Sequence, residues 1–210
     1  ISEMRSVAAR THQAGRTVAL VSTSGALHAG HEALIALAKS RADVVVVVVF
    51  PNPLAFGPSE NFAGYPRSPG ADLKRCGELG VDVVFMPAVE EMFPRGFSTY
   101  VTEEAVTKSL CGISRPAHFR GVTTGTAKLL NIVRPEVLVM GQRDAQQIAV
   151  VRKMINDLCF GTEIAVAPTV RDADGLVISV RNHDLTAGQR QEALSVHAAL
   201  QRAKEMVAQG

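Results

Sequence analysis

Aromatic side chains are scarce in this sequence, which has no tryptophan, two tyrosines and eight phenylalanines among its 210 residues. A core built around large rings is therefore not expected. Hydrophobic residues nevertheless make up 47% of the chain, so a sizeable core must come from valine, leucine, isoleucine and alanine. Aliphatic residues of this kind are typical of a parallel sheet covered by helices on both faces. The length suits one large domain, or one domain with a small appendage.

Cysteine is also scarce, because Cys76, Cys111 and Cys159 lie far apart and none belongs to a C-x-x-C pair. This pattern argues against a disulfide framework or a zinc–thiolate site and fits a reducing compartment better. The longest apolar run, residues 44–50, is too short to span a membrane, and the beginning of the chain shows no signal peptide. We therefore expect a soluble, cytoplasmic protein.

Charge of one sign does not accumulate anywhere along the chain. The chain has 22 lysines and arginines and 20 aspartates and glutamates, so its net charge is +2. The basic residues form neither a run nor a stripe interleaved with aromatics, so neither a nucleic-acid partner nor a membrane partner is indicated. A slight basic excess favours a small molecule that bears phosphate.

Apolar, β-branched segments alternate with amphipathic segments along the chain. This order predicts an α/β fold with a Rossmann-like, doubly wound parallel sheet. Ligands in such folds bind beyond the carboxyl ends of the strands, which directs attention to the turns after Val21, Phe50 and Met140. The predicted strands are residues 17–21, 43–50, 81–86, 137–140 and 164–167, and the predicted helices are about 31–40, 72–79, 103–110, 121–133, about 145–158 and 186–209.

The turn after the first predicted strand, residues 22–31, reads S-T-S-G-A-L-H-A-G-H. Gly25 and Gly30 allow the backbone to approach a ligand closely, and the helix that begins here favours an anion at its N-terminus. His28 and His31 are three residues apart and face the same side of the turn. Two imidazoles in this place suit hydrogen bonding to a polyphosphate and stabilisation of the charge that develops as pyrophosphate leaves.

Two other interpretations of the histidines stay open. They are a partly buried pair with satisfied hydrogen bonds, or they belong to a zinc site. The zinc interpretation is the weaker one, because two ligands are too few and no third candidate lies nearby in the sequence. For H-x-G-H directly after a strand and at the start of a helix, we rank the phosphate-binding interpretation highest.

The H-x-G-H motif in this context resembles the signature of nucleotidyltransferase-type α/β enzymes, which include the class I aminoacyl-tRNA synthetases. Over a longer stretch, the chain resembles the pantoate–β-alanine ligase (pantothenate synthetase) family. The resemblance runs in order along almost the whole chain. The residues that carry it are 23–31, Phe50, Asn52-Pro53, Phe56-Gly57, Tyr65-Pro66-Arg67, 80–82, 90–92, Cys111-Gly112, Ser114-Arg115-Pro116, His118-Phe119, Lys128-Leu129, 131–133, Gly141, Asp144, Gln146-Gln147, 168–171, 174–176, Ser179 and Arg181-Asn182.

This resemblance implies a reaction in two steps. ATP activates pantoate as an acyl adenylate and pyrophosphate leaves, after which the amine of β-alanine attacks the adenylate and AMP leaves. It also implies ATP and Mg²⁺ as cofactors, a small carboxylic acid and an amine as substrates, and a homodimer. An enzyme of this kind mainly holds the reactants in line and neutralises phosphate charge.

The resemblance also assigns roles to individual residues. His31 is the proton-donating group, and Asp144 lies near the ribose or the magnesium ion. The expected catalytic residues are His28, His31, Arg143, Ser179 and Arg181. The expected ATP-binding residues are Thr23, Ser24, Gly25, His28, Gly30, His31, Gly141, Arg143, Asp144, Val170, Ile178, Ser179, Val180 and Arg181. Asn52, Ala55 and Gln147 are expected to bind the acid. Structural explanations without a ligand stay open for three of the positions: a turn residue at Asn52, a solvated helix position at Gln147, and a polar loop at Arg181-Asn182.

Several residues inside these motifs depart from the family pattern. The residues expected to bind the nucleotide keep their positive charge, because Arg143 replaces a lysine. The residues expected to bind the acid differ more in size and polarity from those of the family. A diverged ligase with another acid or amine is therefore a close rival to pantoate and β-alanine. A nucleotide-binding protein without ligase activity, and an enzyme that stops at the adenylate, are rivals from other classes. The departures are Ser24 for Met, Ala55 for Gln, Gln142-Arg143 for Glu-Lys, Ala145 for Tyr, Val180 for Ser, and Gly125 and Thr126 for two valines.

The domain organisation follows from the same resemblance. We expect a nucleotide-binding, Rossmann-like domain over residues 1–182. Residues 183–210 are expected to begin a C-terminal lid domain that is largely absent from this chain. A reduced lid would exclude water less well from a reactive adenylate.

Overall fold

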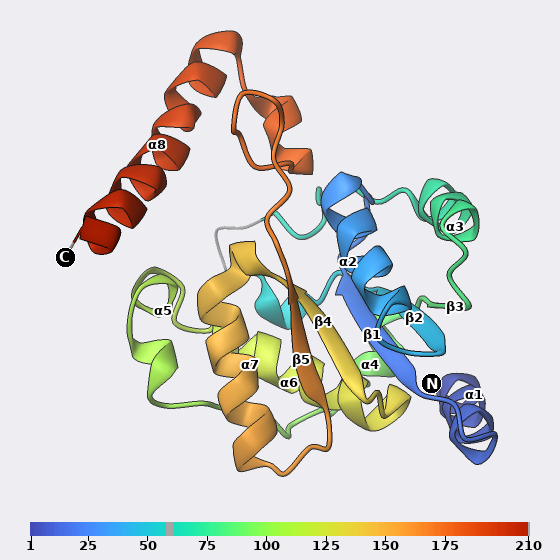
Figure 1. The fold of residues 1–210 in the computed structure, drawn as a ribbon. Helices are drawn as coiled ribbons and strands as arrows, with labels where there is room; N and C mark the ends of the chain where they lie inside the picture. The colour runs from blue at the N-terminus through green and yellow to red at the C-terminus, as the bar shows by residue number, and fades with distance from the viewer. Residues whose placement is uncertain (58–60, 210) are drawn as a thin grey trace.

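Five parallel strands form the centre of the computed structural model, which describes residues 1–57 and 61–209 (Figure 1). The sheet has the order β3-β2-β1-β4-β5, and every neighbouring pair is parallel. The predicted α/β fold with a doubly wound sheet is therefore confirmed. The strands are β1 (Val18–Thr23), β2 (Val44–Val49), β3 (Val83–Phe85), β4 (Val137–Gly141) and β5 (Glu163–Ala167).

Helices cover both faces of this sheet. Alternate strand residues such as Leu20 and Val46 pack on one face against α1 (Ser2–Gln13), α6 (His118–Val133) and α7 (Ala145–Asp157). The residues between them pack on the other face against α2 (Ala29–Lys39) and α3 (Pro69–Glu78). Six consecutive valines can therefore all be buried in β2, because neither face of the strand is exposed to solvent.

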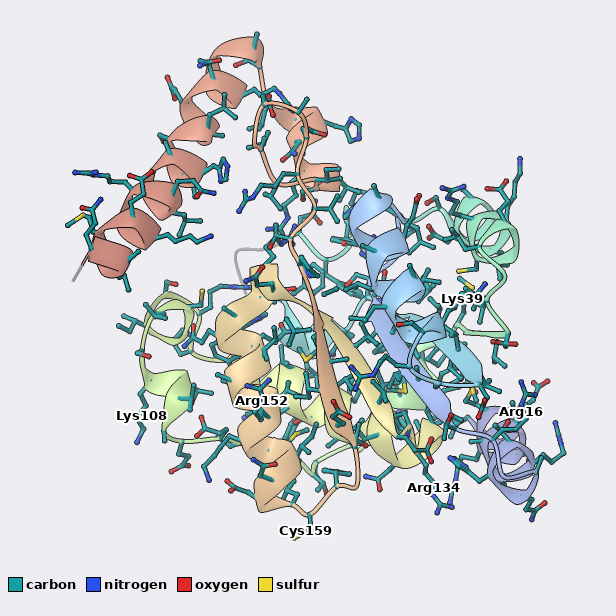
Figure 2. All side chains as sticks on the ribbon, in the orientation of Figure 1. Arg16, Lys39, Lys108, Arg134, Arg152 and Cys159 are labelled. Carbon is teal, nitrogen blue, oxygen red and sulfur yellow. The ribbon has the colours of Figure 1, made fainter. Side chains whose placement is uncertain are left out.

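The ends of the central strands define where a ligand can bind. The chain leaves β1 toward β2 on one side, whereas β4 joins β1 on the other side, so the strand order switches between β1 and β4. Val21 pairs with Val139, which brings the ends of β1 and β4 to the same level. Arg16, Arg134 and Cys159, which precede β1, β4 and β5, lie at the opposite edge of the sheet (Figure 2). The carboxyl edge at this switch point is the expected place for a ligand.

The structure corrects several sequence-based predictions of secondary structure. The predicted helix at 103–110 is wrong, because the Glu103 carboxylate accepts the N–H groups of Ala105, Val106 and Thr107 and holds a loop with a single turn, η2 (Val106–Lys108). The predicted strand at 81–86 is reduced to the three residues of β3. Three helices were not predicted: α1, α4 (Val89–Met92) and α5 (Cys111–Ser114).

A close approach between η1 (Pro53–Ala55) and α6 shapes one side of the carboxyl edge. At Gly121 of α6, a Cβ atom would lie 2.0 Å from the carbonyl oxygen of Leu54. Asn52 begins η1 with its Oδ1 accepting the N–H of Leu54 at 3.0 Å, and its Nδ2 donates to the carbonyl of Gly121 at 2.9 Å. Gly121 therefore sets how deeply η1 sits against α6.

The last helix, α8 (Ala187–Gln209), lies apart from the sheet and contributes no buried residue to the described core (Figure 1). Arg190, near its beginning, bonds the carboxylates of Asp172 and Asp174 at 2.7 and 2.8 Å. The boundary that we predict at residue 182 lies in η4 (Val180–Asp184), and it stays a prediction. Within the described part of the chain, no helix is long and apolar enough to cross a membrane.

The packing at Gly121 predicts the effect of one added methyl group. Gly121→Ala should lower the free energy of unfolding by about 1–3 kcal/mol, the scale of overpacking, because backbone atoms of η1 would have to move. Gly77→Ala is the matched control, since Gly77 is an exposed glycine of α3 with nothing within 4 Å of an added Cβ atom. Urea unfolding should show that this control is unchanged or slightly more stable. A Gly121→Ala protein as stable as the control would contradict the close approach.

Candidate active site

A cavity of about 410 Å³ opens at the carboxyl edge of the sheet, beyond β1 and β4. It is mostly lined by polar groups, which come from the β1–α2 turn, the region after β2, α6, the start of α7 and the segment around residue 180. Its lining residues are Ser22, Thr23, Ser24, Gly25, His28, His31, Phe50, Asn52, Ala55, Phe56, Tyr65, Arg115, His118, Val122, Gly125, Thr126, Leu129, Arg143, Asp144, Gln147, Ser179, Val180 and Arg181.

A second cavity of about 100 Å³ shares His28, His31, Arg143 and Asp144 with the first. It also brings in Gly30, Gly141, Val170 and Ile178, which the first cavity does not contact. Every residue for which we predict a site role from the sequence lines one of these two cavities. The structure thus brings the predicted residues together, whereas their individual roles stay predictions.

The two histidines are fixed by the backbone around them. His28 is the N-cap of α2, and its Nδ1 accepts the N–H of Gly30 at 3.1 Å. The Nδ1 of His31 accepts the N–H of His28 at 3.2 Å. The two rings lie 4.1 Å apart between centroids, so the prediction that they share one side of the turn is confirmed. In this reciprocal cap the imidazoles take the acceptor roles that Ser and Glu side chains usually take.

These contacts determine which nitrogen carries the proton. An imidazole nitrogen that accepts a hydrogen bond has no proton, so each neutral ring carries its proton on Nε2. Both histidines therefore present an N–H donor on the side of the ring away from the backbone. The site offers two donors from neutral rings rather than two positive charges.

The pKa values of both histidines favour the neutral form. Burial lowers the pKa of His31 to about 4, and repulsion from His28 when it is protonated, and from Arg143, acts in the same direction. Burial also lowers the pKa of His28, followed by the charge of Arg143, while Glu32 opposes them. At neutral pH and without a ligand, His31 is thus a hydrogen-bond donor. It gains basicity where an anionic ligand lies against it.

Positive charge comes from the end of β4. Arg143 and Asp144 lie in η3 (Gln142–Asp144), directly after the strand, and line both cavities. Their side chains are about half exposed, and Arg143 Nε lies 3.9 Å from Asp144 Oδ1. Gln147, one turn into α7, is partly buried and lines the larger cavity, so it is not a fully solvated helix position.

The segment between β5 and α8 closes the opposite side of the cavity. It folds back on itself, with Arg171 bridged to Val177 and the N–H of Ile178 donated to the carbonyl of Val170 at 3.1 Å. Ser179 is the N-cap of η4, and its Oγ accepts the N–H of Arg181 at 3.3 Å. This fold-back presents Ser179, Val180 and Arg181 to the same space as the histidines.

The remaining side of the cavity is formed by η1 and α6. Ala55 lines the cavity there and also packs against the apolar core, and its carbonyl contacts His118 Nδ1 at 2.7 Å and Arg115 Nη2 at 3.2 Å. A Cβ atom at Gly125 would lie 2.4 Å from Asn52 Nδ2, so glycine leaves room for the amide as it is placed. Both ends of the Asn52 amide are engaged in shaping η1, which supports its interpretation as a turn residue.

Arg115 and His118 are cavity residues to which the sequence reasoning assigned no role. Arg115 is the C-cap of α5 and His118 begins α6, and both side chains contact the carbonyl of Ala55. Because Arg115 precedes the helix, helical spacing in the sequence could not have indicated that the two side chains meet.

The site offers little to a metal ion on its own. Across the described residues, no group of three or more His, Cys, Asp or Glu side chains is placed to hold one. Both Nδ1 atoms of the histidine pair are already engaged with backbone N–H groups. Asp144 contributes one carboxylate to the cavity wall, which suits an ion that arrives with its other ligands.

The lowered pKa of His31 predicts a pH dependence of stability. Between about pH 6.5 and 4 the unfolded chain binds a proton at this residue that the folded chain does not, so stability must fall as pH falls through this window. His31→Gln, which keeps an acceptor for the N–H of His28, should show a smaller fall. Urea unfolding of both proteins at pH 7.5 and pH 4.5 measures the difference, and equal falls would contradict the burial of a neutral ring.

The sequence of this chain is similar to those of known proteins along its whole length. The family model described as pantoate-beta-alanine ligase matches residues 1–210. A pantothenate synthetase from Moorella thermoacetica is 49% identical over 210 residues, which are 100% of this chain and 74% of that protein. One from Heliobacterium modesticaldum is 48% identical, over 100% of this chain and 75% of that protein.

Solved structures agree with the sequence comparison. Pantothenate synthetase from Thermus thermophilus superposes with a TM-score of 0.93 at 42% identity, over 100% of this chain and 74% of that chain. Pantoate-beta-alanine ligase from Francisella tularensis, complexed with beta-gamma ATP and beta-alanine, has a TM-score of 0.88 at 34% identity, over 95% of this chain and 77% of that chain. With a matching family model over all its residues, relatives near half identity and the same fold, this chain belongs to the pantoate–β-alanine ligase family, a family of ATP-dependent ligases that form a C–N bond.

Proposed function

We propose that this chain activates a carboxylic acid with ATP as an acyl adenylate and transfers the acyl group to an amine. Pantoate and β-alanine are the default substrates, in line with the family and with the ligands named for the Francisella relative. The observation that carries the proposal is the pair of neutral imidazoles, His28 and His31, in one cavity with Arg143 and Arg181. Two N–H donors and two guanidinium groups suit a polyphosphate that loses pyrophosphate.

In the first step, a carboxylate oxygen of the acid attacks the α-phosphorus of ATP. The bond from this phosphorus to the oxygen that bridges toward the β-phosphorus breaks, and pyrophosphate leaves with the electron pair. His28 and His31 donate hydrogen bonds to the phosphate oxygens on which charge grows, while Arg143 and Arg181 neutralise charge from two sides. No proton needs to be transferred in this step, so neutral histidines suffice.

In the second step, the amine nitrogen attacks the acyl carbon of the adenylate. The bond from this carbon to the phosphate oxygen breaks, AMP leaves, and the nitrogen loses a proton to solvent. Gln147 of α7 and Ala55 of η1 line the cavity where the acid would lie. Holding the two reactants in contact supplies most of the acceleration that such a step needs.

Magnesium would enter with ATP. Mg²⁺ is commonly held by substrate phosphates and waters with one or two carboxylates, and Asp144 provides one at the cavity wall. The ion would supply further neutralisation of phosphate charge when bound. The homodimer and the cytoplasmic location predicted from the sequence stay predictions, as does the start of a lid domain at residue 183.

A diverged ligase that takes another acid is a second candidate, and the cavity wall at Ala55 favours it. Ala55 and Gly125 contribute no side-chain hydrogen-bond donor to this wall, and the neighbouring Arg115 and His118 contact the carbonyl of Ala55. Val180 adds an apolar side chain to the cavity from the opposite side. Such a wall suits an acid that is bulkier or carries fewer hydroxyl groups than pantoate.

The adenylate mechanism predicts the products. With MgATP, pantoate and β-alanine, the protein should release AMP and pyrophosphate, and with the acid alone it should exchange labelled pyrophosphate into ATP. His31→Ala should slow the exchange by about 10²-fold, the scale for losing one preorganised donor to developing charge. Because His31 lines the cavity, the variant should remain folded by circular dichroism.

Three outcomes would count against this function. ADP and phosphate as products would exclude the adenylate. Binding of ATP without exchange for any acid in a broad screen would favour a nucleotide-binding protein without ligase activity. Exchange without an amide product for any amine would favour an enzyme that stops at the adenylate.

Ala55→Gln distinguishes the two substrate candidates. A glutamine in the cavity wall would offer a hydrogen-bond partner to the hydroxyl groups of pantoate, worth about one to two decades in affinity. If another acid is the natural substrate, this variant should raise kcat/KM for pantoate and lower it for that acid. Efficient use of pantoate by the unmodified protein, with no better acid in the screen, would contradict the diverged ligase.

A further inference from the structure

A buried carboxylate lies beneath the turn that carries the histidines. Asp72 of α3 is 2% exposed, and within residues 1–57 and 61–209 it is the one charged residue that is buried. Its two oxygens each accept one backbone N–H, from Ala26 to Oδ2 at 3.0 Å and from Leu27 to Oδ1 at 2.8 Å. Asp72 is 45 residues from Leu27 along the chain, so this contact joins two separate elements.

The turn that Asp72 holds is conformationally strained. Gly25 has φ +90° and Ala26 has φ +54°, so two consecutive residues have positive φ. The left-handed region costs an alanine roughly 1–2 kcal/mol, so the surroundings must impose it. The oxygens of Asp72 accept from the two peptide groups that flank Ala26, and a Cβ atom at Gly25 would lie 3.0 Å from Asp72 Oδ2.

The strained turn leads directly to the histidine pair. Leu27, whose N–H is held by Asp72, precedes His28, the N-cap of α2. The direction of this peptide sets where the cap begins and hence where both Nε2 atoms point. A second contact keeps α3 against the same region, because Arg75 donates to Glu32, next to His31, at 2.7 Å. Asp72 also lies in the first turn of α3, where the helix dipole favours a carboxylate.

We propose that Asp72 is a positioning residue for nucleotide activation, which holds the Gly25–Leu27 turn in its strained form so that His28 and His31 present their Nε2–H groups to the phosphates. This inference rests on the proposed function. Asp72 does not line the main cavity and touches no substrate, so it acts through the turn.

The first test replaces the carboxylate by an amide of the same shape. Asp72→Asn keeps one acceptor but turns an NH₂ group toward one backbone N–H. MgATP affinity by calorimetry and the rate of pyrophosphate exchange should each fall roughly ten- to hundredfold, the scale for losing a hydrogen bond to a charged group. Hydrogen exchange at the amides of Ala26 and Leu27 should accelerate by at least about tenfold.

The chain offers a matched control at the other end of β1. The carboxylate of Glu136 accepts the N–H of Val18 at 2.7 Å, also between distant parts of the chain. Glu136 is more exposed than Asp72 and also contacts His12, and Glu136→Gln removes its charge from a backbone contact far from the cavity. It should lower thermal stability without changing MgATP affinity or exchange. An equal loss of MgATP affinity in both variants would show a general effect of destabilisation and overturn the proposal.

A double variant tests whether the strain at Ala26 is what Asp72 opposes. Glycine adopts positive φ readily, so Ala26→Gly should restore part of the MgATP affinity that Asp72→Asn loses. It also supplies a folded protein should Asp72→Asn alone be unstable. A double variant no better than the single one, or a folded Asp72→Asn with normal MgATP affinity and amide protection, would overturn the proposal.

These measurements separate this inference from the proposed function. If the unmodified protein binds MgATP but exchanges no pyrophosphate with any acid, the ligase function fails. MgATP affinity and amide exchange still report whether Asp72 holds the turn.

Discussion

The backbone N–H groups between β1 and α2 must all find acceptors, and the site depends on which acceptors they find. Gly25 uses the hydroxyl of Thr23, while Ala26 and Leu27 use Asp72. Two donors further along the turn use the imidazoles themselves, through Nδ1. An imidazole that serves the backbone in this way has one nitrogen left, and that nitrogen must be a donor. The functional character of the pair is therefore a consequence of how the turn satisfies its own hydrogen bonds.

The fold was largely predictable from the sequence because its strands are buried on both faces and its core is aliphatic. A run such as Val44–Val49 has few alternatives to a central parallel strand. Helix α1 escaped prediction because its buried residues are just Met4 and Ala8, too narrow a stripe to produce a clear period. The loop at 103–110 was mistaken for a helix because the capping of three N–H groups by Glu103 is a local bond that composition does not reveal.

The candidate site was predictable to the level of which residues meet, because strand order places the turns after β1 and β4 together. Its detail was not. Nothing in the spacing of His28 and His31 says which ring nitrogen faces the backbone. Asp72 looked like an ordinary helix residue, since its partners lie more than 40 residues away and are backbone groups. Contacts from a side chain to a distant backbone leave no pattern in a single sequence.

In the proposed function, the nucleotide and the acid lie against largely different elements of the cavity wall. The nucleotide would lie against the turn after β1, the end of β4 and η4, and the acid against η1, α6 and Gln147 of α7. Changes such as those at Ala55 and Gly125 therefore alter one wall without disturbing the histidines. Such a division lets the choice of acid diverge while the chemistry at phosphorus stays the same.

The ion pairs of Arg190 attach α8 to the segment that follows β5. They fasten the beginning of a 23-residue helix to Asp172 and Asp174, and a helix of that length reaches roughly 34 Å. Because the same fold-back presents Ser179 and Arg181 to the cavity, α8 and this wall of the cavity are anchored to one segment. A displacement of α8 relative to the sheet would therefore be transmitted to the wall that carries Ser179 and Arg181.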